Sequence, residues 1–199
     1  MLETKDKYSK MAKYYDWIEE RMPMSKFKKE CIDILSGKIL EVGIGSGGSL
    51  KFYSKEHDVT GIDFSSGMLA LAKEKIIETH MDNVKLVEMN IENMDFLDNS
   101  FDSVFSACVF CTVPNPEKGL SEIYRVLKPG GKVVFLEHMK SNSKIKNFFM
   151  GIIEKIINPI MGTFLLRETE NSIRKLNFSK VESSNVMMGD VLRIIIATK

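Results

Sequence analysis

The stretch Ile39–Gly48 reads ILEVGIGSGG and decides the fold of this chain. A short apolar run ends at Val42, and glycine then fills four of the six positions from 43 to 48. Glycine lacks a Cβ atom, so it reaches positive φ and lets a ligand lie directly against the main chain. A helix after such a loop adds unpaired N–H groups and the positive end of its dipole. The pattern predicts a strand, a ligand-binding loop and a helix near Ser49–Lys55.

The spacing of this loop fits more than one cofactor. Gly43-x-Gly45-x-x-Gly48 also satisfies the dinucleotide fingerprint, in which an acidic residue follows about 20 residues later at the end of a strand. Asp63, in the stretch VTGID, meets that requirement. A nicotinamide-dependent oxidoreductase is therefore one interpretation. Glu41 and the downstream sequence have to distinguish it from proteins that bind another cofactor.

Composition limits the class of protein. A chain of 199 residues with 44% hydrophobic content is long enough for one domain with a sizeable core. A net charge of +1 argues against nucleic-acid binding through a broad basic surface. The polar start MLETKDKYSK predicts no secretion signal, and the apolar-rich stretch Ile145–Leu166 holds too many charges for a membrane span. Three cysteines fit a reducing compartment, so we expect a cytoplasmic protein.

Cys108 and Cys111 form a C-x-x-C pair, which is found in redox sites and in halves of zinc sites. The apolar neighbours Phe105, Val109 and Phe110 instead indicate the buried end of a strand. Cys31 cannot complete a second pair. We therefore predict no metal site.

Strand-like and helix-like segments alternate along the chain. We expect helices over Tyr8–Arg21, Met24–Leu35, Met68–His80, Glu117–Leu127 and Glu168–Leu176, and strands over Lys38–Val42, Asp58–Ile62, Val84–Glu88, Phe101–Val109 and Lys132–Glu137, with a hairpin of Ser179–Met187 and Val191–Thr198. Repeated βαβ units predict an α/β, Rossmann-like, doubly wound sheet that binds ligands at the carboxyl ends of its strands. We expect a single domain over residues 1–199, with a helical cap over 1–36 and an apolar insertion over 141–167.

Four blocks in this order resemble class I S-adenosylmethionine-dependent methyltransferases: EVGIGSGG, GIDFS, NSFDSVFS and RVLKPGGKVVFLEH. The resemblance covers residues 38–140. It implies S-adenosylmethionine as the cofactor and a seven-stranded sheet of order 3-2-1-4-5-7-6, mostly parallel with an antiparallel last strand. The terminal hairpin suits that sheet, whereas it is uncommon in a dinucleotide-binding domain.

The resemblance also assigns residues to the cofactor. Glu41, Gly43 and Gly45 would lie under the methionine moiety, and the Asp63 carboxylate would accept hydrogen bonds from both ribose hydroxyls. Further expected contacts are Phe64, Met68, Asn90 and Ile91 near the ribose and adenine, Ser106 and Ala107 beside the methyl group, and Tyr8 and Tyr15 in the entry segment. Asn90 stands where the family often has an acid, so Asp63 is the firmer assignment.

The sequence says less about the site of the methyl acceptor than about the cofactor. Methyl transfer needs an in-line attack on an activated carbon, so alignment and desolvation supply much of the catalysis and a base is optional. His138 is the best candidate for a base because imidazole titrates near neutrality, although a loop histidine bonded to backbone is the plainer interpretation. Cys111, Thr112, Phe149 and Ile153 are predicted to line the acceptor pocket.

The insertion repeats apolar residues at three-then-four spacing from Ile145 to Leu165. Such a face predicts a lid, a dimer contact or a helix on a membrane surface. The stretch from CTVPNPEKG to LRET is similar to methyltransferases of quinones, phospholipid headgroups and small thiols. We therefore expect a methyltransferase, monomeric or homodimeric, that acts on a small apolar or lipid-linked acceptor and contacts membranes peripherally at most. A nicotinamide-dependent oxidoreductase and a noncatalytic cofactor-binding module are the alternatives.

Overall fold

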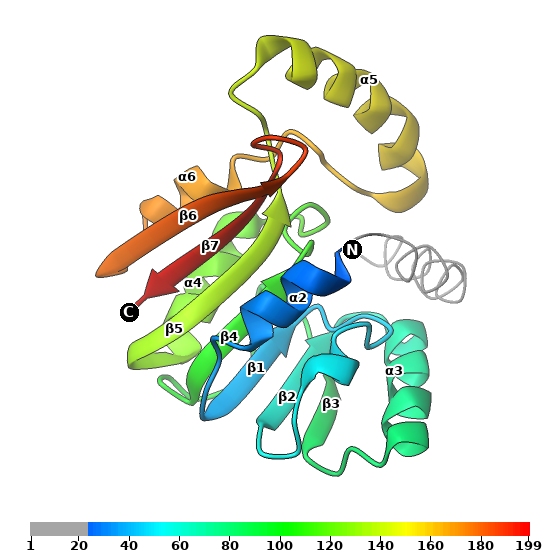
Figure 1. The fold of residues 1–199 in the computed structure, drawn as a ribbon, viewed down its shortest axis with the longest axis vertical. Coiled ribbons are helices and arrows are strands. Elements are labelled where there is room, and N and C mark those ends of the chain that lie inside the picture. The colour runs from blue at the N-terminus through cyan, green and yellow to red at the C-terminus, as the bar shows by residue number, and fades with distance from the viewer. Residues whose placement is uncertain (1–23) are drawn as a thin grey trace.

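The fold is a single twisted sheet with helices on both faces (Figure 1). A computed structural model describes residues 24–199. The predicted helix Tyr8–Arg21, including Tyr8 and Tyr15, lies outside the described residues. The described elements in chain order are α2 (Ser25–Ile32), β1 (Lys38–Val42), η1 (Leu50–Phe52), β2 (Asp58–Asp63), α3 (Ser66–Thr79), β3 (Val84–Glu88), β4 (Phe101–Ala107), α4 (Pro116–Val126), β5 (Leu127–His138), α5 (Lys144–Met161), α6 (Thr169–Arg174), β6 (Lys180–Met187) and β7 (Leu192–Thr198).

The seven strands lie in the order β3-β2-β1-β4-β5-β7-β6. β1 pairs in parallel with both β2 and β4, whereas β7 runs antiparallel to β5 and β6. The chain steps outward from β1 to β3 and then returns to β4, so the strand order reverses between β1 and β4. This topology confirms the predicted fold class and order, and it places a ligand site at the carboxyl ends of these strands.

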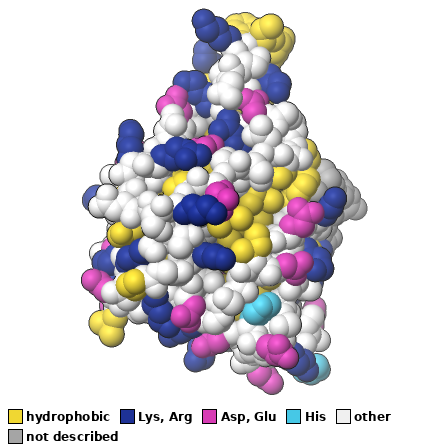
Figure 2. Space-filling view, turned by 60° about the vertical axis from the view of Figure 1, so that its left-hand side comes forward, with side chains coloured by type: hydrophobic (Ala, Val, Ile, Leu, Met, Phe, Trp, Pro, Cys, Tyr) yellow, Lys and Arg dark blue, Asp and Glu magenta, His cyan; other side chains and the backbone are white. Residues whose placement is uncertain are grey.

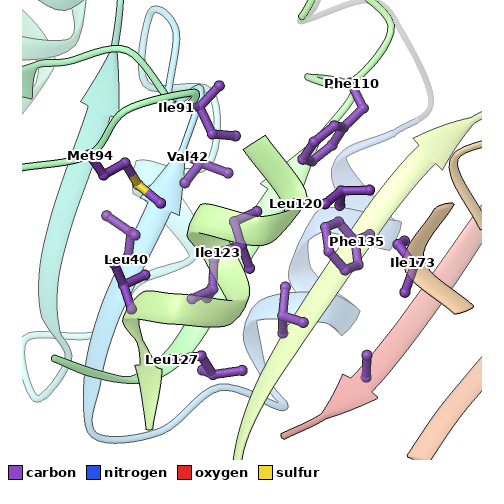
Figure 3. Packing of buried hydrophobic residues seen from close by; sticks show 14 of the residues in the cluster. Leu40, Val42, Ile91, Met94, Phe110, Leu120, Ile123, Leu127, Phe135 and Ile173 are labelled. Carbon is purple, nitrogen blue, oxygen red and sulfur yellow. The ribbon is translucent and has the colours of Figure 1, made fainter. Parts of the chain in front are cut away.

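Apolar side chains cover both faces of the sheet. On one face α4 and α6 pack over the strands, and Figure 3 shows Leu120 and Ile123 of α4 directed at Leu40, Val42 and the neighbouring strands. On the other face Cys31 and Ile32 of α2 and Ala72 of α3 join a second buried cluster. Strands buried on both faces explain why their sequences read as nearly continuous apolar runs.

The prediction of a helix over Ser49–Lys55 was wrong, because the glycine loop leads into the three-residue 3-10 helix η1. The cause is a pair of side-chain bonds to Glu41 in β1. Its carboxylate accepts the Ser49 hydroxyl at 2.6 and 2.8 Å and the Tyr53 hydroxyl at 2.9 Å. These bonds draw the chain back towards the sheet, and Tyr53 is already extended at ψ 134°.

One strand boundary also differs from the sequence prediction. β5 begins at Leu127 and includes Pro129, Gly130 and Gly131, where its register against β4 shifts. α5 includes Pro159, which has no N–H to donate to the Lys155 carbonyl and lies in the last turn of the helix. The Ser65 side chain caps α3 by accepting the N–H of Met68.

α5 stands at one end of the molecule and packs closely on none of the described helices or strands (Figure 1). Met150 is its one buried residue. Within residues 24–199, no helix combines the length and hydropathy that crossing a bilayer requires.

Substitution of Gly131 by alanine tests the irregularity in β5. A Cβ atom there would lie 2.8 Å from the Asp102 carbonyl oxygen and 2.9 Å from the Lys128 carbonyl oxygen. Backbone atoms cannot step aside, so we expect Gly131→Ala to lower the free energy of unfolding by about 1–3 kcal/mol. Urea denaturation measures this change in the free energy of unfolding. Gly151→Ala in α5 is the control, because its Cβ would meet only Leu166 at 3.6 Å and should leave stability unchanged or raised.

Candidate functional site

The site is a pocket at the carboxyl ends of β1, β2 and β4, where the strand order reverses. The glycine loop after β1, the end of β2 and the segments after β3 and β4 each contribute to its wall. The lining residues are Lys28, Glu41, Gly43, Ile44, Gly45, Ile62, Asp63, Phe64, Met68, Met89, Asn90, Ile91, Ala107, Cys108, Val109, Thr112, Val113 and Pro114.

Gly43 and Gly45 form the floor of the pocket in a conformation that few other residues adopt. Their φ angles are 66° and 58°. A Cβ atom on Gly43 would overlap the side chain of Val109, which lines the opposite wall. The two glycines therefore keep open a cradle of bare backbone, as the sequence predicted.

Glu41 lies beside this cradle and is only 3% exposed. Its bonds to Ser49 and Tyr53 tie the strand to the far end of the glycine loop. Burial, followed by the Glu41 charge, raises the pKa of the Tyr53 hydroxyl well above its usual value. The tyrosine thus stays protonated and donates to Glu41, while Glu41 still lines the pocket.

Asp63 bridges the end of β2 to the glycine loop. One carboxylate oxygen accepts the Gly45 N–H at 3.0 Å, and the other accepts the Ser65 N–H at 2.8 Å. Burial raises the pKa of Asp63 to about 6, against the lowering effect of its backbone hydrogen bonds. A carboxylate held this firmly in a pocket wall is preorganised for hydroxyl donors.

The predicted adenine side is built from short loops after β2 and β3. Phe64, Met68, Asn90 and Ile91 all line the pocket. The Asn90 side-chain oxygen accepts the Glu92 N–H at 3.0 Å, which fixes the loop after β3. The Asn90 side chain therefore has a structural bond here in addition to its place on the pocket wall.

The turn after β4 forms the wall opposite the glycine loop. Ala107, Cys108, Val109 and Thr112 line the pocket, and Cys108 has a positive φ of 54°. A non-glycine residue in this region is strained unless its surroundings impose the conformation. The Cys108 N–H donates to the Leu136 carbonyl of β5 at 2.8 Å, and the residues that follow Cys108 are held by a buried side chain of the same strand, Glu137.

Glu137 lies at the end of β5 and is fully buried. Its Oε1 accepts the Ser106 hydroxyl at 3.0 Å, the Val109 N–H at 2.8 Å and the Phe110 N–H at 3.4 Å. Its Oε2 is buried and has no hydrogen-bond partner. Burial raises the pKa of Glu137 to about 7, although these three bonds lower it. Glu137 thereby shapes the turn without lining the pocket itself.

The segment after α5 holds the same turn from outside. The Phe164 N–H donates to the Cys111 carbonyl at 2.8 Å, and Arg167 Nη2 donates to the Val113 carbonyl at 2.9 Å. The Arg167 guanidinium lies 4.4 Å from the centre of the Phe164 ring. The pocket wall is thus fixed by β5 on one side and by the insertion on the other.

Several predicted site residues lie elsewhere. Ser106 is fully buried against Glu137, and Cys111 is buried with its thiol donating to the Cys108 carbonyl. All three cysteines are free, and residues 24–199 contain no cluster suited to a metal ion. Phe149 and Ile153 are exposed on α5 and do not line the pocket.

His138 also does not line the described pocket. It follows Glu137 in β5, so its side chain projects to the opposite face of the sheet. Burial lowers its pKa, and its Nδ1 atom is buried without a hydrogen-bond partner. The role of His138 as a catalytic base therefore stays a prediction, and no contact between His138 and the pocket supports it.

The pocket also contains residues that we did not predict from the sequence, namely Lys28, Cys108 and Val109, and the positioning role of Glu137 was not predicted either. One signal for Glu137 was present: an acid directly after the apolar run VVFL of a predicted buried strand needs an internal partner. No local pattern identified Lys28, because it reaches the pocket from α2.

Comparisons with known proteins agree with this geometry. Residues 40–135 match the family described as "Methyltransferase domain". The ubiquinone/menaquinone biosynthesis C-methyltransferase of Rickettsia typhi is 33% identical over 177 residues, which cover 82% of this chain and 71% of that protein. The phosphatidylethanolamine N-methyltransferase of Cereibacter sphaeroides is 44% identical over 108 residues. Those residues cover 54% of this chain and 53% of that protein, so this chain spans about half of that relative's length.

A solved structure shares the fold. Phosphoethanolamine N-methyltransferase 2 of Haemonchus contortus, in complex with phosphomonomethylethanolamine and S-adenosylhomocysteine, matches with a TM-score of 0.76 at 21% identity. The match covers 96% of this chain and 58% of that one. At this level of identity the likeness concerns the fold alone.

The structural role of Glu137 can be tested by removing its charge. Its pKa is raised in the folded state, so its contribution to stability is full below pH 4.5 and is lost as the pH rises through about 7. Glu137→Gln keeps one acceptor oxygen and removes this titration. We expect the wild type to lose about 3 kcal/mol relative to Glu137→Gln between these pH values, measured by urea denaturation.

Glu137→Ala, which leaves the buried donors of Ser106, Val109 and Phe110 without an acceptor, should cost about 3 kcal/mol or more at pH 4.5, where the contribution of Glu137 is full. Glu182→Gln on the exposed strand β6 is the control and should be neutral. Parallel pH profiles for the wild type and Glu137→Gln would contradict the assignment.

Proposed function

The chain belongs to the family of class I S-adenosylmethionine-dependent methyltransferases, and on this basis we propose that it transfers a methyl group to a small apolar or lipid-linked acceptor. Family membership excludes the nicotinamide-dependent interpretation of the glycine loop. The observation that carries the proposal is the bridge made by Asp63, whose buried carboxylate joins the bare Gly43–Gly45 backbone to the end of β2. Asp63 offers carboxylate oxygens, and Gly43 and Gly45 offer unobstructed main chain.

The pocket residues fit the cofactor of the family. Asp63 would hold the ribose hydroxyls, Phe64, Met68 and Met89–Ile91 would enclose the adenine, and Glu41 with Gly43 and Gly45 would hold the methionine moiety. When bound there, S-adenosylmethionine supplies a methyl group activated by its sulfonium. The residues of this chain then have to orient the acceptor and exclude water.

The acceptor wall suits such a task. Ala107, Cys108, Val109, Thr112, Val113 and Pro114 carry no ionised side chain, and Glu137 and the Phe164–Arg167 segment fix their backbone. A rigid, neutral wall desolvates an incoming amine, thiol or ring carbon and aligns it with the methyl carbon. Alignment of this kind can supply roughly 7–11 kcal/mol in favourable intramolecular reactions. These six residues of the acceptor wall include no carboxylate and no imidazole, so the proposal relies on positioning.

The choice of acceptor rests on two supports. One is that relatives of this chain carry names for phospholipid-amine and quinone methylation. The other is the exposed apolar helix α5, which would give the protein a peripheral contact with membranes, where such acceptors reside. A phospholipid amine, a quinone precursor and a thiol are the acceptor classes that the proposal includes.

The role of Asp63 predicts a pH-dependent affinity for the cofactor. Ribose hydroxyls donate to the ionised carboxylate, so affinity should fall as the pH drops below about 6, where Asp63 takes up a proton. Asp63→Asn should weaken S-adenosylhomocysteine binding about ten- to a hundredfold and abolish this pH dependence. Isothermal titration calorimetry measures the affinity and its pH dependence. A range from pH 5 to 8 brackets a carboxyl group with a pKa of about 6.

Asp58→Asn, at the exposed opposite end of β2, is the matched control and should bind normally. Unchanged binding by Asp63→Asn, with its fold intact by thermal denaturation, would remove Asp63 from the site.

Methyl transfer itself is tested with radiolabelled S-adenosylmethionine and a cell extract separated into lipid and water-soluble fractions. We expect label in the lipid or apolar fraction, and none with Gly43→Val, whose side chain would overlap Val109. Label confined to water-soluble polar products would refute the apolar acceptor. A chain that binds the cofactor but labels nothing would favour a noncatalytic binding module.

A further inference from the structure

The apolar face of α5 points away from the protein. Its exposed side chains are Ile145, Phe148, Phe149, Ile152, Ile153, Ile156 and Ile160. At 100° per residue these positions occupy one continuous half of the helix, and the buried residue Met150 lies on the other half. A surface helix of a globular protein normally turns this face to its core. α5 is therefore inverted relative to an ordinary amphipathic helix.

The orientation of α5 is fixed by polar bonds on its inner half. Glu154 Oε2 accepts the N–H groups of Leu165 and Leu166 at 2.6 and 3.0 Å. Asn147 exchanges two hydrogen bonds with the backbone of Ser141, and the Asn158 side chain donates to the Thr163 carbonyl. Because the polar residues of the helix are engaged towards the protein, the helix cannot roll to bury its apolar half without breaking these bonds.

Lysines flank the apolar face. Lys144 and Lys155 lie along one edge and Lys146 along the other, by the same helical spacing. Lys146 contacts Asp190 at 3.4 Å, while Lys144 and Lys155 form no ion pair with any residue in the described range 24–199. The one acid of α5, Glu154, is used on the inner half. Figure 2 shows hydrophobic and Lys or Arg side chains side by side at the tip of the molecule, where α5 lies.

We propose that α5 lies flat on an anionic lipid bilayer, with its isoleucine and phenylalanine side chains inserted among the acyl chains and its edge lysines at the lipid phosphates. The inference rests on the proposed function, because it states where the enzyme meets a lipid-linked acceptor. Long lysine side chains reach from an apolar face to the level of the headgroups, and their charge draws the helix to anionic lipid.

A second copy of the chain is a poorer occupant of this face. Two α5 helices packed face to face would bring their lysine edges together with no acid on either outer half to compensate. A bilayer containing phosphatidylglycerol offers both the apolar interior and the negative charge. Charge complementarity therefore favours lipid.

The contact would also bring the bilayer to the pocket. The chain leaves α5 at Met161 and reaches the pocket wall within a few residues, where Phe164 and Arg167 bond to the turn of Cys111–Val113. Phe164 is itself 40% exposed. The lipid surface and the acceptor wall thus lie at the two ends of one short segment.

Vesicle flotation of the full chain tests the proposal, with vesicles of phosphatidylcholine alone and vesicles rich in phosphatidylglycerol. Ile156→Glu places a charge at the centre of the face, and Ile77→Glu places the same charge on α3, where the exposed fraction of the isoleucine is also 63%. We expect binding to the anionic vesicles, a loss of about tenfold or more in Ile156→Glu and no loss in Ile77→Glu. Lys144→Gln with Lys155→Gln should weaken binding and its salt dependence, while Lys132→Gln, at an exposed position of β5, should not.

Binding of S-adenosylhomocysteine, measured on the same variants, separates this proposal from the function. Intact cofactor binding with no flotation of the wild type would overturn the membrane surface and leave the methyltransferase standing. Equal losses in Ile156→Glu and Ile77→Glu, or equal binding to neutral and anionic vesicles, would also overturn it. A dimer in sedimentation velocity that Ile156→Glu converts to a monomer would make a second copy the occupant.

Discussion

Three buried carboxylates at the ends of strands hold the loops of the site, and the rest of the pocket depends on them. Glu41 on β1 binds the Ser49 and Tyr53 hydroxyls, Asp63 on β2 binds the Gly45 and Ser65 N–H groups, and Glu137 on β5 binds the Val109 N–H group. Burying a charge costs free energy unless hydrogen bonds compensate for it, so each acid fixes the loop that satisfies it. The walls of the pocket are therefore rigid before any ligand arrives, and this rigidity is what a reaction that proceeds by alignment requires.

How much of the site could be predicted from the sequence depends on how far apart along the chain the hydrogen-bonded residues lie. Asp63 and the glycines sit in short motifs where residue type and spacing reflect a local backbone requirement, so they could be identified directly. Glu137 acts on residues 27 to 31 positions away, and that contact exists only once β4 and β5 pair. Likewise, the chain after the glycine loop forms η1 instead of the expected helix, and the Ser49 and Tyr53 hydroxyls tie it back to Glu41 in β1.

The alternation of strands and helices predicted a doubly wound sheet, and the resemblance to a known family supplied the strand order, which the structure confirms. α5 shows what the spacing of apolar residues cannot predict. The spacing of its apolar residues identified an amphipathic helix, but it could not determine whether that face turns inward or outward. The direction depends on Glu154, Asn147 and Asn158, whose partners come from segments before and after the helix. Phe149 and Ile153 could line the predicted acceptor pocket only if this face turned inward, and both side chains are exposed.

The attachment of α5 has a consequence for how this fold can diversify. The helix is held by hydrogen bonds of Asn147, Glu154 and Asn158 and contributes one buried side chain to the protein, so the sheet gains little stability from it. Substitutions on its outer half are therefore nearly free of thermodynamic constraint from the core. Selection can remodel this half of the helix from one lineage to the next while the donor-binding edge of the sheet stays the same, and the two surfaces can evolve at different rates within one domain.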